Sequence, residues 1–503
     1  MLFNSWQFVL FFPIVTLLYF VLPFRFRTIL LLLAGAVFYM VFIPRYIFIL
    51  ITLIIIDYFA GILIAKSKKT KRGLFLTISL ISNLGFLGFF KYFNFFSANL
   101  NALFNWLGVG YATPLLEIIL PIGLSFHTFQ AMAYTIEVYR GKIKPEKKIL
   151  TYALYVVFYP QLVAGPIERP QNLLPQIKVR HSFNYDNAVS GLRLMAWGLF
   201  KKMFIADRLA VAVNYIYNQP TLFHGPVLFM ATFYFAVQIY CDFSAYSDIA
   251  IGAARVMGIK LMVNFRHPYL AKDIGDFWQR WHISLSSWFR DYVYIPIGGS
   301  RYGINRFIIA ILAVFLLSGL WHGANWTFII WGALHASYYL LGRFISRPMV
   351  LLENILSGLG LKIFSAIKIL TTFVIVTYAW IFFRANNLFD ARYIALDIFR
   401  GWGGYFRYFW ESLPLVLSGQ ANKLLLYQLY LPLKMDMPEL EFMMLVIGLL
   451  ILLVFEYLDR RDNFWERFSR LPLTARWFVY IVIVLLIINF GAMKPSKFIY
   501  FQF

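Results

Sequence analysis

Long apolar stretches alternate with short polar segments along most of the chain. Most of these stretches approach the roughly 20 helical residues that a bilayer crossing requires. We therefore expect a polytopic membrane protein whose polar segments are too short to fold around a core of their own. The predicted spans lie at approximately 6–23, 28–43, 46–64, 74–93, 115–138, 189–206, 225–243, 307–320, 324–343, 364–384, 440–457 and 474–492.

Lysine and arginine residues mark alternate connections between the first spans. Arg25 and Arg27 follow the first span, a basic cluster at 66–72 follows the third, and "YRGKIKPEKK" follows the fifth. Basic connections of membrane proteins stay on the cytoplasmic side, so the pattern predicts an N-terminus outside the cytoplasm. The first span lacks a basic region before it and a small-residue cleavage pattern after it, so we expect a retained helix and not a removed signal peptide.

The alternation fails at 149–165. A helix crossing there would put the basic residues of 169–202 outside, and the stretch also contains "FYPQLVAGP", which is rich in helix breakers. We infer a re-entrant or kinked element that returns to the cytoplasmic side. Such backbone is tolerated at membrane depth only when it packs in protein or lines a water-filled cavity, which indicates a hollow interior. The stretch 390–437 mixes aromatic, glycine and charged residues and is predicted to be an amphipathic or extramembrane excursion.

Composition supports one membrane-embedded unit. Of 503 residues, 61% are apolar and 14% are charged, whereas a soluble chain is nearer a quarter charged. The net charge of +23 resides in short clusters between apolar segments, which favours membrane lipids over nucleic acid as the partner. A single cysteine, Cys241, excludes an intramolecular disulfide and a cysteine-rich metal site. The expected fold class is all-α, with roughly 11–13 helices, some re-entrant or interfacial, around a central tunnel or funnel.

The segment "DFWQRWHISLSSWFRDYVYIPIGGSR", residues 276–301, is far more polar than its surroundings. It is too polar to span lipid, so we expect it to lie at an interface or to line a cavity. Whether His282 at its centre is functional or only part of an anchoring helix stays open on spacing alone. On a single helix, one stripe of the segment consists of Phe277, Trp281, Leu285, Trp288 and Tyr292, and another of Arg280, Ser284, Ser287 and Asp291.

A second histidine stands in an apolar stretch. Apart from His322 and His335, residues 307–343 contain no ionisable acid or base before Arg343. A continuous helix of that length would be roughly 55 Å long, against a hydrocarbon core of about 30 Å, so it must break, most naturally at "SGLWHGAN". His322 then lies at the break, where an ionisable residue is a functional candidate and a suitable proton acceptor at neutral pH. The alternative is a buried structural histidine bonded to a freed carbonyl.

Other candidates are weaker. His335 lies on an apolar face and is expected to be structural, while His127 either lines the cavity or caps a kink. Asp242 and Asp248, in "CDFSAYSD", are predicted to orient a substrate or a histidine, or else to pair with Arg255 or Arg266. The chain has no P-loop, dinucleotide-binding glycine motif, nucleophile elbow or zinc-protease motif.

Several motifs together resemble the membrane-bound O-acyltransferase (MBOAT) family, particularly the bacterial branch typified by the membrane subunit for alginate O-acetylation. The resemblance runs almost from end to end, and the pair "RWHISLSSWFRDY" and "WHGAN" is highly specific. One departure is Glu137, where that branch is expected to have aspartate, which preserves the charge. The other motifs are "LPIGLSFHTFQAMAYTIEVYRG", "LVAGPIERP", "KKMFIAD", "YCDFSAYSDIAIGAARVMGIKLMVNFRHPYL", "LSGLWHGANWTFIIWG" and the ending "FIYFQF".

The resemblance implies a single membrane domain over 1–503, with a catalytic core at about 115–345 between N-terminal helices (1–114) and C-terminal helices (346–503). It implies that His322 is the catalytic base and His282 the other signature residue. Asn325 or backbone N–H groups freed at the break are the candidate donors to the oxyanion. The expected substrate-binding residues are Trp321, Asn325, Arg280, Arg290 and Asp242.

The resemblance also implies a reaction. Acetyl-CoA is the expected cytosolic donor, with no bound cofactor and no metal, and hydroxyls of an extracytoplasmic polysaccharide are the expected acceptors. The expected partner is an extracytoplasmic SGNH-hydrolase-like acetyltransferase, and the expected location is the bacterial cytoplasmic (inner) membrane. A basic cluster is predicted to attract the donor phosphates. Its members are Arg169, Lys201, Lys202, Lys272, Arg280 and Arg290.

Alternatives from other classes remain. A D-alanyl-transferring relative that modifies teichoic acids would take its acyl group from a carrier protein, although such chains are usually shorter. A lipid or polysaccharide transporter would explain a cavity but not the two histidine motifs, and the absence of inverted repeats weakens that reading. A non-catalytic scaffold would tolerate loss of both histidines.

Overall fold

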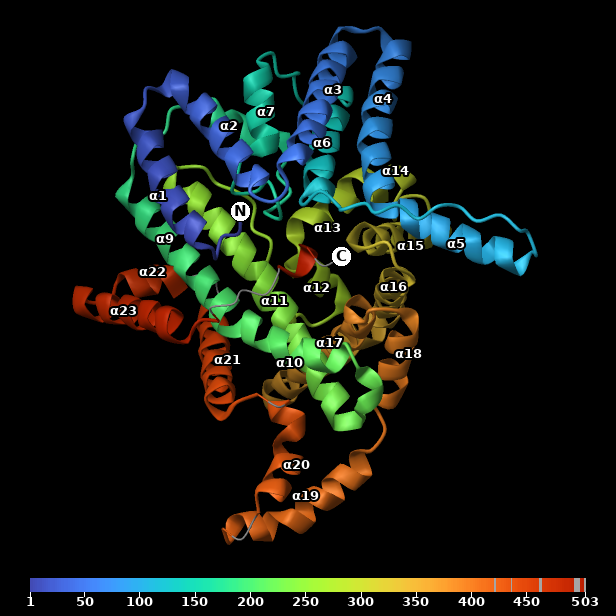
Figure 1. Ribbon diagram of the computed structural model, residues 1–503, viewed down its shortest axis with the longest axis vertical. Helices are drawn as coiled ribbons and strands as arrows, with labels where there is room; N and C mark the ends of the chain where they lie inside the picture. The colour runs from blue at the N-terminus through green and yellow to red at the C-terminus, as the bar shows by residue number, and fades with distance from the viewer. Residues whose placement is uncertain (420–421, 436, 461–463, 493–497, 502–503) are drawn as a thin grey trace.

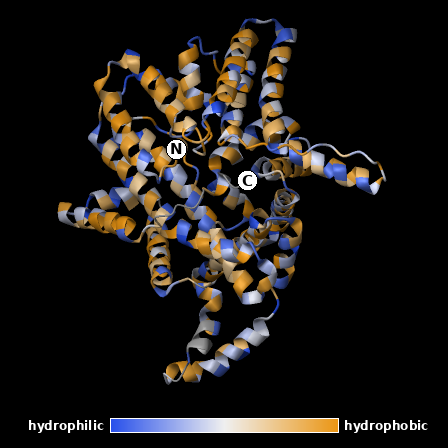
Figure 2. Cartoon of the chain, in the orientation of Figure 1, coloured by the Kyte–Doolittle hydropathy of each residue, from blue (hydrophilic) through white to orange (hydrophobic). Residues whose placement is uncertain are grey.

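The computed structural model describes residues 1–419, 422–435, 437–460, 464–492 and 498–501 (Figure 1). All regular secondary structure in these residues is helical, so the predicted all-α membrane fold is confirmed. Apolar residues cover the outward faces of the peripheral helices, as expected where lipid surrounds them (Figure 2). Seven helical stretches of the described residues are long and apolar enough to cross a bilayer: Pro44–Lys66, Thr70–Trp106, Gly225–Val256, Ile304–His322, Gly358–Arg384, Glu439–Asp459 and Leu473–Phe490.

The N-terminal helices follow the predicted spans closely. They are α1 (Trp6–Val21), α2 (Phe24–Met40), α3 (Ile47–Lys66) and α4 (Lys69–Leu87), after which a π-helical turn, Gly88–Tyr92, leads into α5 (Phe93–Trp106). Helix α5 projects sideways from the bundle (Figure 1).

The predicted span 115–138 is wrong at its start. Helix α6 covers only Leu124–Tyr139, and residues 107–123 are not helical. Pro114 and Pro121 lack the N–H that a helix interior needs, and Gly123 adopts φ +80°, which favours glycine. Asparagine side chains of α5 hold this strand-like return: Asn94 accepts from Leu116 N at 2.9 Å, and Asn101 accepts from Thr113 N at 2.6 Å.

The segment 149–165 does not cross as one helix, as the sequence predicts. Helix α7 (Ile149–Val157) has nine residues, and buried irregular backbone leads from it to α8 (Pro170–Ile177). Gln130 and Gln161 both donate to Tyr155 O, at 2.5 and 2.8 Å, so side chains satisfy backbone that the short helix leaves open. From residue 151 onward the element is almost entirely buried and therefore packed in protein, whereas Ile149 and Leu150 at its start are exposed.

The centre of the molecule is α11 (Gly225–Val256), a 32-residue helix that is buried along most of its length. It packs against α9 (Tyr185–Leu199), which continues through a π-helical segment, Phe200–Ala206, into α10 (Asp207–Tyr217). Gly191 and Gly252 allow the close approach, because a Cβ on either would lie within 2.6 Å of the carbonyl oxygen of the other.

The predicted break at "SGLWHGAN" is confirmed. Helix α15 (Ile304–His322) ends at His322, and α16 (Trp326–Ile355) begins after three residues and packs back along it. By contrast, the polar segment 276–301 is not the single helix that its periodicity predicts. It divides into α12 (Ile274–Arg280), α13 (Ile283–Phe289), a π-helical turn at Arg290–Tyr294 and α14 (Ile295–Ile297).

The C-terminal part returns to the core. After α17 (Gly358–Arg384), the predicted excursion contains three shorter helices, and the last two of them extend from the lower end of the molecule in Figure 1. Residues 420–421 and 436 of that excursion lie outside the described residues. Described residues near both ends of the chain come together at the core, where Phe3 and Phe498 each lie against the ring of Tyr246. The remaining helices are α18 (Leu388–Asp397), α19 (Trp402–Leu417), α20 (Lys423–Lys434), α21 (Glu439–Asp459), α22 (Phe464–Ser469), α23 (Leu473–Phe490) and a 3-10 turn at Ile499–Phe501.

The basic connections gather at one end of α3, α4 and α6. Arg72 donates to Tyr139 O at 2.6 Å, and Tyr58, in the second half of α3, donates to Lys147 O at 2.7 Å. Arg140 donates to Asp291 O at 3.2 Å, which brings the polar segment to the same end. The basic connection 66–72, the segment 140–148 and the end of the polar segment therefore share one side of the protein, as the sequence predicts.

Candidate active site

His322 is the last residue of α15, and the structure compensates for the helix end beside it. Lys91 Nζ donates to Trp321 O at 2.7 Å and to His322 O at 2.9 Å, while Tyr92 Oη donates to Leu320 O at 2.7 Å. A helix end leaves carbonyls without intrahelical partners, and a cation there also interacts favourably with the helix dipole. The π-helical turn that carries Lys91 and Tyr92 therefore caps the end of the helix that carries His322.

His322 lines a cavity of about 1130 Å³. The cavity lies where α4 ends and α6 begins, and Phe42 from just before α3 also lines it. These are the ends of α3, α4 and α6 opposite the basic connections. Its wall is formed by Leu2, Phe42, Phe89, Phe90, Lys91, Asn94, Ile118–Phe126, Val163, Asn214, Asn218, Trp321–Asn325, Phe328, Arg384–Asn386 and Tyr500.

His282 lies at the break between α12 and α13. Its backbone has φ +44° and ψ +53°, a left-handed conformation that costs a non-glycine residue about 1–3 kcal/mol and is found mainly where other contacts enforce it. Asn264 supplies those contacts. Its backbone carbonyl accepts from Ile283 N at 3.0 Å, and its side-chain Oδ1 accepts from Ser284 N at 3.2 Å. The neighbouring chain thus satisfies the N–H groups that the break exposes.

The two histidines are close together. Their ring centroids are 6.5 Å apart, and both side chains are almost fully buried. Both ring nitrogens of His282 and Nδ1 of His322 are buried without a hydrogen-bond partner. His282 is outside the spanning helices, and burial lowers its pKa to about 3, so its imidazole is neutral at physiological pH. A neutral imidazole can accept a proton.

Aromatic rings enclose the pair. Trp321 lies 5.9 Å from His282 and 5.0 Å from His322 between ring centroids, and Tyr500 lies 5.6 Å from His322. Trp331 and Phe383 each lie 5.1 Å from His322. An apolar surround of this kind strengthens electrostatic interactions and limits access of water.

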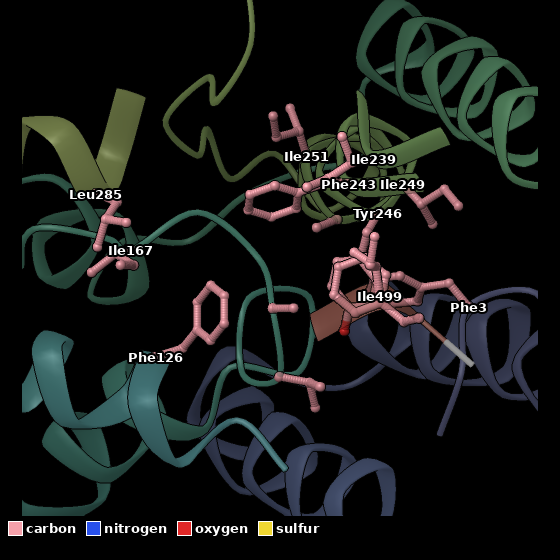
Figure 3. Packing of buried hydrophobic residues seen from close by; sticks show 14 of the residues in the cluster. Phe3, Phe126, Ile167, Ile239, Phe243, Tyr246, Ile249, Ile251, Leu285 and Ile499 are labelled. Atoms are coloured by element: carbon pink, nitrogen blue, oxygen red, sulfur yellow. The ribbon is translucent and has the colours of Figure 1, made fainter. Parts of the chain in front are cut away.

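Tyr500 reaches the site because the end of the chain is tied to α11. Asp242 Oδ2 accepts from Ile499 N at 2.8 Å, and Asp242 Oδ1 forms an ion pair with Lys202 at 2.8 Å. Figure 3 shows Ile499 beside Phe3 and near Tyr246 and Phe243 of α11, so both ends of the chain pack on this helix. Asp242 therefore contacts the C-terminal segment directly, and its role in substrate binding stays a prediction.

The aspartates of "CDFSAYSD" do not follow the pairing that the sequence predicts. Both lie inside α11 and not beyond a span, because the helix continues to Val256. Asp242 pairs with Lys202 and Asp248 with Lys201, each at 2.8 Å, instead of with nearby arginines. Lys201 and Lys202 precede α10 in the adjoining helix, whose register against α11 a sequence alone does not reveal.

The other predicted substrate-binding residues fall in different places. Asn325 lines the cavity, but its Oδ1 caps α16 by accepting from Thr327 N at 3.0 Å. Arg280 pairs with Asp276 at 2.6 Å, and Arg290 pairs with Asp291 at 2.9 Å with 63% of its side chain exposed. Neither arginine is among the residues that line the His322 cavity.

The predicted basic cluster is divided. Lys201 and Lys202 are buried in ion pairs with α11 and α10, whereas Arg169 lies near the basic end. Arg169 pairs with Asp291 at 3.2 Å and lies 4.9 Å from the ring of Tyr292. Only the members near the polar segment are therefore placed to meet a ligand from that side.

The remaining histidines differ in their surroundings. His335 is buried and its Nδ1 accepts from Trp278 Nε1 at 3.3 Å, which agrees with a structural role. His127 is buried in the first turns of α6, and neither ring nitrogen has a partner. Among the described residues, no group of three or more His, Cys, Asp or Glu side chains could hold a metal ion.

Three cavity residues were not singled out from the sequence. Lys91 had a usable signal, because a lone lysine within "FLGFFKYFNFF" is an ionisable residue in an apolar stretch. Arg384 stands at the end of a predicted span, where arginine is ordinary. Tyr500 lies far along the chain from both histidines, and nothing local in "FIYFQF" indicates its contact with them.

The family model and the relatives described below are all acyl-transferring proteins. A family model described as MBOAT, membrane-bound O-acyltransferase family, matches residues 146–388. The probable alginate O-acetylase AlgI of Pseudomonas putida is 35% identical over 414 residues, which cover 80% of this chain and 81% of that protein. The peptidoglycan O-acetyltransferase of Helicobacter pylori is 35% identical over 78% of each chain. The teichoic acid D-alanyltransferase of Bacillus subtilis is 30% identical over 43% of this chain and 57% of its own.

Proposed function

Because the chain belongs to the membrane-bound O-acyltransferase family, we propose that it passes acetyl groups from a cytosolic donor to hydroxyls of an extracytoplasmic polysaccharide. Its O-acyltransferase activity follows from the family and from its named O-acetyltransferase relatives. The acetyl group, the donor and the acceptor are our proposal, with acetyl-CoA as donor substrate and no bound cofactor.

The observation that carries the proposal is the position of His322. It lines a cavity at the ends of α3, α4 and α6 opposite the basic connections, and His282 lies beside it in the segment that continues to the basic end. Since basic connections stay in the cytoplasm, the cavity faces outward in this proposal. His322 then stands where an acceptor from outside meets an acyl group from inside.

The proposed chemistry needs one base and one oxyanion donor. A hydroxyl is a poor nucleophile until its proton is removed, and His322 accepts that proton as the oxygen attacks the thioester carbon. The carbon–sulfur bond then breaks, and the imidazolium returns the proton to the leaving thiolate. The N-terminus of α16, which begins at the cavity wall with Asn325 as its cap, favours the negative charge of the intermediate.

We propose that the donor binds along the polar segment, which reaches the basic end at Asp291. Arg169, Arg280 and Arg290 lie on or against the polar segment and would meet the phosphates of acetyl-CoA. We place the protein in the bacterial cytoplasmic membrane, because every relative named above is bacterial. An SGNH-hydrolase-like partner outside would receive the acetyl group or complete its transfer to the polymer.

The second candidate is D-alanyl transfer to teichoic acid, which the Bacillus subtilis relative favours. That relative matches 43% of this chain, whereas the two O-acetylating relatives match 78–80% of it. The wider similarity favours acetylation. A transporter of lipid or polysaccharide would not require a base such as His322 in the wall of the cavity.

The test is transfer across a membrane. Purified protein in proteoliposomes would receive radiolabelled acetyl-CoA on the side of the basic connections and an oligosaccharide on the other side, with and without an SGNH-type partner. We expect donor consumption and alkali-labile acetyl ester only in this arrangement. Turnover of a D-alanyl carrier protein in place of acetyl-CoA would reject the proposal in favour of the second candidate.

A further inference from the structure

One wall of the cavity carries polar side chains that the proposed transfer step does not use. Arg384 ends α17, Asn386 follows it, and Asn214 and Asn218 come from the end of α10. The residue before Arg384, Phe383, lies 5.1 Å from the His322 ring between centroids. The polar wall is therefore next to the proposed base and not in a remote part of the cavity.

Arg384 is held by neutral groups. Its Nη2 donates to Asn214 Oδ1 at 2.7 Å, and its Nη1 donates to Asn386 Oδ1 at 3.2 Å. Asn386 in turn donates to Tyr217 O and to Asn218 Oδ1, both at 3.3 Å. A guanidinium has five N–H donors, so donors remain beyond these two bonds. The network fixes the orientation of the arginine without neutralising its charge.

No carboxylate balances this arginine in the described part of the chain. Arg384 forms no ion pair among the described residues, and the residues that line the cavity include two cations and no acid. The other cation, Lys91, is committed to the carbonyls of α15. The C-terminal end of α17 offsets part of the charge through the helix dipole, but only 7% of Arg384 is exposed, and a buried charge without a counter-ion is costly.

The surroundings of Arg384 favour a saccharide as the ligand that carries its counter-ion. Amide side chains donate to and accept from hydroxyls, and the same cavity has aromatic walls at Phe89, Phe90 and Trp321 against which a sugar ring can pack. A guanidinium matches a planar carboxylate with two parallel hydrogen bonds. We propose that Arg384, with Asn214 and Asn386, binds the carboxylate of an acidic saccharide acceptor. This inference rests on the proposed function, because it takes the acceptor to enter this cavity.

The test is equilibrium binding to purified protein without any acyl donor. The probes are a short alginate oligosaccharide and its methyl-esterified form, which differ in charge but hardly in shape. We expect the acid form to bind about 10- to 100-fold more tightly, since a hydrogen-bonded charge contributes on this scale. Arg384→Gln should abolish the difference, and Arg384→Lys should restore part of it. Arg392→Gln removes an exposed arginine from α18 and should leave the difference unchanged.

The ratio of the two affinities is the informative quantity, because misfolding of a variant lowers both affinities alike. Equal affinity of the wild type for both forms, or an undiminished ratio in Arg384→Gln, would overturn the proposal. Arg384-dependent binding of a peptide with a free C-terminal carboxylate, without binding of either saccharide, would assign the site to a protein partner instead. Acetyl-CoA consumption is measured separately: its loss beside intact saccharide binding rejects the proposed function and leaves this site standing.

Discussion

The centroids of the imidazole rings of His282 and His322 lie 6.5 Å apart, and each histidine lies at a break between two helices. His322 ends α15 at the cavity wall, and His282 joins α12 to α13 within the segment that continues to the basic end. Two breaks in an apolar core leave backbone groups that need polar partners, and here Lys91, Tyr92 and Asn264 supply them. The compensation lets both histidines keep ring nitrogens unbonded.

Lys91→Met is expected to weaken the end of α15. The substitution keeps a similar apolar volume but leaves Trp321 O and His322 O without their donor, which should lower the free energy of unfolding by about 1–3 kcal/mol. Transfer activity should fall further than stability, because His322 shares this helix end. Thermal unfolding and acetyl-CoA consumption would be measured together. Lys68→Met, at the exposed α3–α4 connection, is the control, and equal effects of both substitutions would contradict the capping role.

Tyr500→Ala is expected to impair transfer while Tyr500→Phe preserves most of it. The ring, 5.6 Å from His322 between centroids, helps to close the aromatic enclosure, and its removal admits water. The alanine variant should therefore hydrolyse more acetyl-CoA per acetyl ester formed. The measurement is the ratio of free acetate to ester. An unchanged ratio in the alanine variant would show that the C-terminal segment does not seal the site.

The two sides of the protein can be tested by cysteine labelling in a Cys241→Ser background. Ser67→Cys and Lys144→Cys lie at the basic end, and the exposed Ala112→Cys lies in the return between α5 and α6 at the opposite end. A membrane-impermeant reagent added outside intact cells should label only Ala112→Cys. Labelling of Ser67→Cys or Lys144→Cys from outside would invert the proposed direction of transfer.

Charge reversal on the polar segment should weaken binding of the donor. Arg280→Glu and Arg290→Glu are expected to raise the KM for acetyl-CoA severalfold while leaving the binding of an extracytoplasmic partner unchanged. Both arginines pair with acids of the polar segment, so the alternative is that they only anchor it to anionic headgroups. Assays in detergent without anionic lipid separate these roles. Unchanged donor kinetics in both variants would support the anchor and leave the donor site elsewhere.

The sequence predicted the break at His322 because an apolar stretch much longer than the thickness of the bilayer cannot remain one helix. The break at His282 was missed because the apolar stripe from Phe277 to Tyr292 fits a continuous helix. Its interruption depends on Asn264, which lies earlier in the chain and pairs across space. Local periodicity carries no information about such a partner.

The same limit applies to the rest of the site. The charges of Asp242 and Lys202 are visible in the sequence, but their pairing depends on how α11 packs on the adjoining helix. Tyr500 and Arg384 reach the cavity from the last segment and from the end of α17, and neither has a local pattern that indicates it. The division into 1–114, 115–345 and 346–503, and the roles of the predicted site residues, stay predictions.

The most direct test of the account is acetyl transfer by the His322→Ala variant in the proteoliposome assay. Loss of a general base costs on the order of 10²–10⁴ in rate, so we predict near-complete loss of acetyl ester with normal membrane levels of the protein. His282→Ala should also impair transfer, whereas His224→Ala, which removes a histidine with 67% of its side chain exposed, should not. Substantial transfer by a well-folded His322→Ala protein would contradict the central claim that this histidine is the base.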